Sequence, residues 1–206
     1  MNIEISSEAF ILLIGLPALA VTLLLLRRKR SASSLFFIAV FWIYLCFLIG
    51  ATLFPIDLSP DTRAWMRSQA GFSDRMNLIP FYFGPFGSLW RSRDMLLSNI
   101  LLTVPFGFGI GFVARVRPRD LRWLPLAVGF GIEGAQFGVG LLLGYPYRVL
   151  DINDTLMNAL GVVAGYGLFW LLARLMLWLD ARNGSRLKGL AGEMVLAAER
   201  SLGEDR

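Results

Sequence analysis

Five long apolar runs are the feature that most constrains how this chain can fold. They cover residues 9–26, 33–54, 95–113, 123–143 and 155–179. An apolar stretch of about 20 residues is long enough to cross the hydrocarbon core of a bilayer as a helix. The sequence therefore predicts an all-α fold: a polytopic membrane helix bundle with about five transmembrane helices, forming one integral membrane domain over residues 1–206.

Charges at the ends of these runs predict how the bundle is oriented. Glu4 and Glu8 precede the first run and the basic block 27–30 follows it. A secretory signal has its basic residues before the apolar run, so we expect a retained helix. With the N-terminus outside, thirteen Lys and Arg residues fall in cytoplasmic segments and six in outer ones. This bias predicts a membrane protein with its N-terminus outside and its C-terminus in the cytoplasm.

Two segments lie outside the apolar runs. In the outer segment 55–94, Ser59, Pro60 and Asp61 are typical of a helix start, and we expect a short interfacial helix there. The aromatic-rich stretch 77–90 is typical of residues that anchor a protein at the membrane interface. The segment 180–206 is interpreted as a basic cytoplasmic tail that forms a solvated surface helix.

Composition limits the chemistry. The chain has no histidine and one cysteine. These counts exclude a His-based triad, a thiolate metal cage and an intramolecular disulfide. We expect no cofactor, no bound metal and no nucleic-acid partner. Any chemistry would rest on carboxylates, amides and arginine.

Glu133 is the most informative polar residue within an apolar run. It lies ten residues into the fourth run, about 15 Å along a helix and hence near mid-membrane. A charge there costs on the order of 3 kcal/mol, so such residues usually face protein or water and have a function. Gln136 follows at i+3 on the same side. The alternative is a protonated Glu133 that hydrogen-bonds a neighbouring helix as structural glue.

The turn into the fifth run contains a second group of polar residues. Asp151, Asp154 and Asn158 have i, i+3, i+7 spacing, which predicts one stripe of a helix. Asp151 or Asn153 is also a candidate cap for that helix. Arg148 would pair with one acid or hold a phosphate. The two aspartates are candidate acid/base groups. The alternative that their oxygens hold a divalent cation stays open.

With the N-terminus outside, these residues converge on an outward-facing polar pocket, with Glu133 and Gln136 beneath the others. An amide that joins adjacent helices is the alternative interpretation of Asn99. The candidates for catalysis are Glu133, Asp151 and Asp154, and those for ligand binding are Asn77, Asn99, Gln136, Arg148 and Asn158.

At these positions the sequence resembles the VanZ-like family of bacterial membrane proteins. The matching pieces span residues 75–166: Asn77-Leu-Ile-Pro-Phe81, Asn99 with Pro105-Phe106-Gly107, Glu133-Gly-Ala-Gln136, and Arg148 through Asp151, Asp154, Asn158 and Gly161. The chain departs from the family pattern in having Tyr147 before the arginine and Asn153 where an acid is frequent. The resemblance implies a multi-helix protein of the bacterial cell envelope, located in the inner or plasma membrane. It also implies a link to antibiotic resistance, since the founding member is associated with low-level teicoplanin resistance.

The leading functional hypothesis is a pocket that acts on or binds an amphiphilic envelope ligand. The expected partner is a membrane lipid or a lipid-linked envelope substrate, and whether the protein is an enzyme stays open. The alternative is a non-catalytic accessory subunit that sequesters a lipophilic drug or a lipid-linked precursor. A transporter has little support because no inverted repeat is visible.

Overall fold

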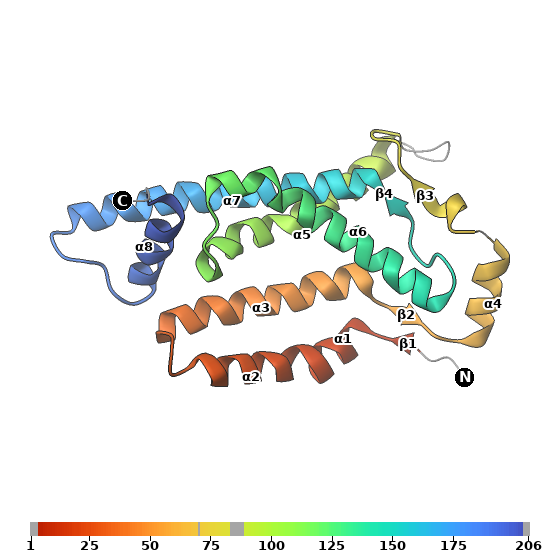
Figure 1. The fold of residues 1–206 in the computed structure, drawn as a ribbon, viewed down its shortest axis with the longest axis horizontal. Helices are drawn as coiled ribbons and strands as arrows, with labels where there is room; N and C mark the ends of the chain where they lie inside the picture. Colours follow the sequence, from red (N-terminus) through yellow and green to blue (C-terminus); the bar gives the residue numbers. More distant parts are fainter. Residues whose placement is uncertain (1–3, 70, 83–88, 204–206) are drawn as a thin grey trace.

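The structure, a computed structural model, describes residues 4–69, 71–82 and 89–203 and consists almost entirely of helices (Figure 1). Five helical segments are long and apolar enough to cross a membrane: Ser7–Leu26, Ala32–Leu53, Leu96–Val113, Leu124–Leu143 and Ile152–Arg182. The predicted helix bundle with five spans is therefore confirmed, and the segment ends differ from the predicted ones by a few residues.

The first span lies at the side of the bundle. It consists of α1 (Ser7–Phe10), a π-helical turn (Ile11–Gly15) and α2 (Leu16–Leu26), and it packs beside α3 (Ala32–Leu53). The remaining spans are α5 (Leu89–Val113), α6 (Leu124–Leu143) and α7 (Ile152–Arg182). A short 3-10 helix, Pro118–Arg122, connects α5 to α6. The most extensive packing joins α5 to α7, so this pair forms the centre of the fold.

Glycines allow α5 and α7 to approach each other closely. A Cβ atom at Gly161 would lie 2.2 Å from Thr103 Oγ1, and one at Gly165 would lie 1.9 Å from the backbone oxygen of Val104. Small residues permit such close backbone contact between membrane helices. The approach brings the first turns of α7 against α5 near Asn99.

Two short sheets form at the end of the bundle where α3 finishes and α7 begins (Figure 1). Strand β1 (Glu4–Ile5) pairs antiparallel with β2 (Ile56–Asp57), and β3 (Met76–Asn77) pairs parallel with β4 (Leu150–Asp151). In the second sheet, Asn77 stands opposite Asp151. The register thus places a residue of the outer segment beside the start of α7.

The predicted short helix in the outer segment is α4 (Pro60–Gln69). Asp57 organises its start, because its carboxylate accepts hydrogen bonds from the hydroxyls of Ser59 and Thr62. Hydrogen bonds from Ser59 and Thr62 lower the pKa of Asp57 below its ordinary value. Its position in the headgroup region stays a prediction, and residues 83–88 of the expected aromatic anchor lie outside the described part of the chain.

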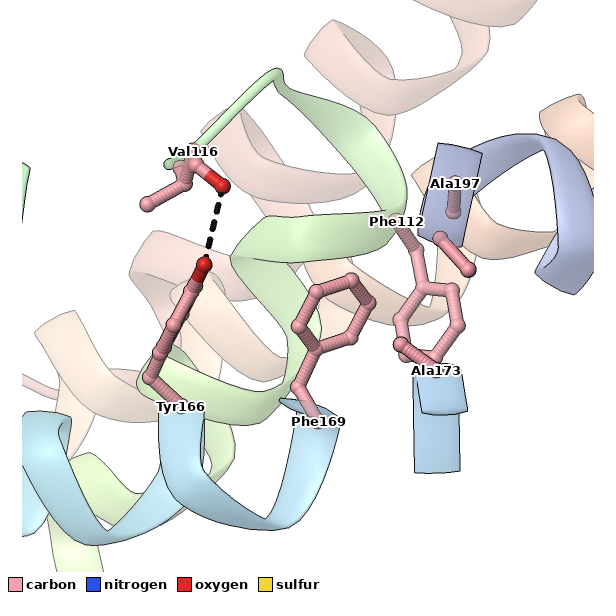
Figure 2. Close-up of a cluster of buried hydrophobic side chains, with 7 residues drawn as sticks. Phe112, Val116, Tyr166, Phe169, Ala173 and Ala197 are labelled. Carbon is pink, nitrogen blue, oxygen red and sulfur yellow. Dashed lines mark hydrogen bonds between the residues drawn. The ribbon is translucent and has the colours of Figure 1, made fainter. Parts of the chain in front are cut away.

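The opposite end of the bundle is closed by α8 (Gly189–Leu202), which packs against α7, α5 and α3. Ala197 and Ala198 of α8 are fully buried. The tail forms the expected helix, but the expectation that it is solvated is wrong for one face, which packs against the bundle through Glu193, Val195, Ala197, Ala198 and Ser201. The core that it joins, shown in Figure 2, comprises Phe112, Val116, Tyr166, Phe169, Ala173, Ala197 and Ala198.

Candidate functional site

Glu133 lies halfway along α6 and is only 3% exposed. Its Oε2 atom accepts a hydrogen bond of 3.2 Å from the backbone N–H of Asp151. The chain that follows α6 therefore runs back beside the second half of this helix before α7 begins. We expected Glu133 to lie beneath the other polar residues, but this return segment brings Asp151 into direct contact with it.

Asp151 is the N-cap of α7, as one of the two capping alternatives predicted. Its Oδ1 atom accepts hydrogen bonds from the backbone N–H of Asn153 at 2.8 Å and from Nδ2 of Asn77 at 3.0 Å. The positive end of the helix dipole favours an acid at this position. A single carboxylate oxygen thus holds the helix start and strand β3 together.

Asp154 lies in the first turn of α7 and faces α5. Its Oδ1 atom accepts a hydrogen bond of 2.6 Å from Nδ2 of Asn99. One turn further along α7, Asn158 is 1% exposed and its backbone oxygen accepts a hydrogen bond of 2.8 Å from Thr103 Oγ1. Asp154 and Asn158 therefore share the side of α7 that faces α5, whereas Asp151 leaves the predicted stripe to act as the cap.

The three acids form one electrostatic cluster. Asp151 and Asp154 are close enough to Glu133 for their charges to act on it. Within the described part of the chain, their hydrogen-bond donors are side-chain amides and backbone N–H groups rather than cationic side chains. We call Glu133, Asp151, Asp154, Asn77 and Asn99 the carboxylate–amide cluster.

Each acid of this cluster has one carboxylate oxygen without a hydrogen-bond partner among the described residues. These oxygens are Glu133 Oε1, Asp151 Oδ2 and Asp154 Oδ2. Each can take up a proton or accept a hydrogen bond from a ligand. In the described segments, no group of three or more Asp, Glu, Cys or His residues has an arrangement that would hold a metal ion.

Gln136 and Arg148 lie outside the carboxylate–amide cluster. Gln136 Nε2 donates to the backbone oxygen of Thr52 at 3.0 Å, and Arg148 Nη2 donates to that of Phe54 at 3.0 Å. The last carbonyls of a helix lack intrahelical partners, so the end of α3 attracts both donors. With Arg75, these two side chains line a small cavity of about 10 Å³, which is room for roughly one water. An ion pair between Arg148 and an acid, one of the two alternatives considered, is absent among the described residues.

Asn153 is a member of the site that the sequence suggested only as a possible cap. It is 2% exposed, and its side chain accepts from the backbone N–H of Phe81 at 2.6 Å and donates to the backbone oxygen of Tyr82 at 2.9 Å. The same Tyr82 oxygen accepts from Asn77 at 2.7 Å. Phe81 has a φ of 61°, an uncommon value for a non-glycine residue. Asn153 and Asn77 thus hold the loop 78–82 next to the acids. The only local signal was a polar residue beside the helix start.

These features define a polytopic membrane protein with a buried acid site between three helices. A model of the VanZ/LLP1 family matches residues 41–173, more than half of the chain. The chain therefore belongs to the VanZ/LLP1 family. The match begins within α3 and ends within α7, so it is wider than the segment 75–166 and includes the entire carboxylate–amide cluster. Searches among curated proteins and among solved structures gave no match.

Proposed function

We propose that the carboxylate–amide cluster acts on, or binds, an amphiphilic ligand of the bacterial cell envelope. The observation that carries this proposal is that Glu133 and Asp154 each keep one carboxylate oxygen without a partner among the described residues. Acids within a membrane bundle are costly and usually functional. Structural glue alone would be achieved at lower cost by an amide in place of either acid.

The hydrogen bonds suggest different roles for the three acids. Glu133 and Asp154 exchange a proton with a ligand hydroxyl or accept a hydrogen bond from it, as general acid/base groups do. Asp151 is a positioning residue, because its Oδ1 already holds Asn77 and the start of α7. Asn99 orients Asp154 through its amide.

The loop beside the acids supports a ligand with an apolar part. Leu78, Ile79 and Phe81 are exposed, whereas Asn77 and Asn153 on the inner side hold polar contacts. A polar cluster next to an exposed apolar loop suits a molecule with a polar head and a lipid tail. Arg148 is exposed beside the adjacent one-water cavity that Gln136 also lines, and its remaining N–H groups would contact an anionic part of the head group at the surface.

The charge bias of the loops supports placing this site at the outer leaflet. The basic segments 27–30, 115–122 and 182–188 lie at the end of the bundle opposite the carboxylate–amide cluster (Figure 1). Because Lys and Arg favour the cytoplasmic side, the N-terminus and the cluster are outside and α8 is inside. The ligand is then a lipid or lipid-linked envelope precursor of the bacterial plasma membrane, and the expected phenotype is teicoplanin-type glycopeptide resistance.

The experiment compares Glu133→Gln, Asp151→Asn and Asp154→Asn with Asp61→Asn, an exposed acid on α4 at the same end of the bundle. Each variant is expressed at equal membrane levels in a deletion strain, and the minimal inhibitory concentration of teicoplanin is measured. The lipid and cell-wall composition of each strain is measured as well. For an enzyme, Glu133→Gln or Asp154→Asn alone removes nearly all of the effect.

A graded loss across the three variants would instead indicate the non-catalytic accessory subunit. Wild-type behaviour of both Glu133→Gln and Asp154→Asn would show that the cluster is not the functional site. The control Asp61→Asn should match the wild type in every readout.

A further inference from the structure

A second polar pocket lies at the opposite end of the bundle, between the α5–α6 connection, α7 and the end of α8. Its volume is about 380 Å³. Three of its lining residues are Arg117, Arg119 and Arg174, and no acid is among the described residues that line it. Such a concentration of arginine favours an anion, and guanidinium groups bind phosphate oxygens in a bidentate manner.

The walls of this arginine pocket hold their shape through contacts within the protein. The guanidinium carbon of Arg174 lies 4.1 Å from the centre of the Trp170 ring, which orients that side chain. The connection is fixed by hydrogen bonds from Tyr166 Oη to the Val116 oxygen at 3.1 Å and from the Arg117 N–H to Asp120 at 2.8 Å. The arginines are therefore presented on a supported surface.

Ser201 gives an independent indication of a ligand. It lines the pocket from α8 and is 2% exposed, and its Oγ atom is buried with no hydrogen-bond partner among the described residues. A buried hydroxyl without a partner is uncommon in folded proteins and calls for an explanation. An acceptor oxygen in the pocket would supply that partner.

The position of the pocket along α7 indicates which kind of molecule carries the anion. Arg174 follows the first residue of α7 by 22 positions, which is about 33 Å along the helix at 1.5 Å per residue. This length slightly exceeds the roughly 30 Å hydrocarbon core, so Arg174 reaches the head-group layer. Leu171 and Leu175 beside it are exposed and face lipid in a membrane. The pocket therefore opens where phospholipid head groups lie.

We propose that the arginine pocket binds the phosphate of an anionic phospholipid in the leaflet at the α8 end. The lipid contacts α7 through Arg174, the α5–α6 connection through Arg119 and α8 through Ser201, so it joins α8 to the bundle. This site is separate from the carboxylate–amide cluster and does not depend on the function of that cluster. Basic pockets between membrane helices typically bind anionic lipid head groups in this way.

The test uses the purified full-length protein in detergent, with phosphatidylglycerol, phosphatidylcholine or inorganic phosphate added. The variant Arg119→Gln/Arg174→Gln is compared with Arg27→Gln/Arg28→Gln, which removes the same charge from the same end but does not line the pocket. Thermal unfolding and native mass spectrometry report the bound lipid. We expect phosphatidylglycerol to stabilise the wild type and the control equally, and to bind at least tenfold more weakly to the pocket variant.

Three results would overturn the proposal. Equal stabilisation of the wild type by phosphatidylcholine and phosphatidylglycerol would show that the pocket does not require an anionic head group. This comparison needs no variant. Equal stabilisation by inorganic phosphate would assign the pocket to a soluble anion. Equal phosphatidylglycerol binding by the wild type and the Arg119→Gln/Arg174→Gln variant would show that the lipid does not bind in the arginine pocket.

Discussion

The polar residues of the carboxylate–amide cluster differ in how much of their hydrogen-bonding capacity is already used. Asp151 is engaged by Asn77 and by its own helix start, whereas Glu133 and Asp154 each have one described hydrogen bond. In a membrane bundle, an acid with an unused oxygen is costly unless a ligand, a proton or water compensates it. Asp151 also keeps one oxygen without a described partner, but its two hydrogen bonds hold strand β3 and the start of α7, so we assign it the positioning role.

Asn153 offers a test at the scale of one side chain. Asn153→Ala removes the acceptor of the Phe81 N–H and one donor to the Tyr82 oxygen. A hydrogen bond contributes about 1 kcal/mol net, so amide exchange in the loop 78–82 should rise about fivefold to tenfold. Hydrogen–deuterium exchange with mass spectrometry measures this change. Asn183→Ala, which removes an exposed contact to Ser185, is the control, and unchanged exchange in the Asn153 variant would contradict the assigned contact.

Among the helices, the close approach of α5 and α7 sets the geometry of the site. The glycines of α7 at 161 and 165 allow the backbones to touch, and this contact places Asp154 within hydrogen-bonding distance of Asn99. Larger residues on this side of α7 would push the helices apart, because the interior is close-packed. The site therefore depends on residues that have no side chain.

Two glycines of α7 allow a matched test of the close packing between α5 and α7. Gly165→Ala would place a Cβ 1.9 Å from the Val104 oxygen, whereas a Cβ at Gly167 meets nothing within 4 Å. We expect Gly165→Ala to lower the free energy of unfolding by about 1–3 kcal/mol or more. Gly167→Ala should be neutral or slightly stabilising, because alanine favours the helix. Unfolding in mixed detergents measures both variants, and equal stability of the two would show that the helices do not meet at Gly165.

Across the whole molecule, the two ends of the bundle have different chemistry. The carboxylate–amide cluster and the short sheets occupy one end, and α8 with the basic loops occupies the other (Figure 1). Five segments are long and apolar enough to cross a membrane, and helices that cross it would have these two ends on opposite sides. The orientation decides which leaflet would supply the proposed ligand of the carboxylate–amide cluster.

Cysteine labelling tests this orientation. Ser68→Cys lies on α4 at the end with the acids, and Ser185→Cys lies between α7 and α8 at the other end; both positions are exposed. A membrane-impermeant maleimide added to intact cells should label Ser68→Cys and leave Ser185→Cys unlabelled until the cells are opened. The wild type, whose Cys46 is buried, should stay unlabelled. Labelling of Ser185→Cys alone in intact cells would reverse the topology.

The amino-acid sequence by itself determined the five spans, because the length and apolarity of a run decide whether it can cross a bilayer. It also made Glu133 a candidate as a polar residue within an apolar run, and Asp151 and Asp154 candidates through their helical spacing before the fifth run. Tertiary structure decided their partners. Asn77 and Asp151 meet through a parallel strand pair, and Asn153 reaches Phe81 across 72 positions of the chain.

The same distinction explains the differences from the sequence predictions. Arg148 and Gln136 turn to the carbonyls at the end of α3, and α8 packs into the core instead of staying solvated. Local sequence gives the residue type and its helical face but not the surface that a neighbouring element presents to it. Hydrogen-bond partners and burial are set by that surface, so only the tertiary structure could supply them.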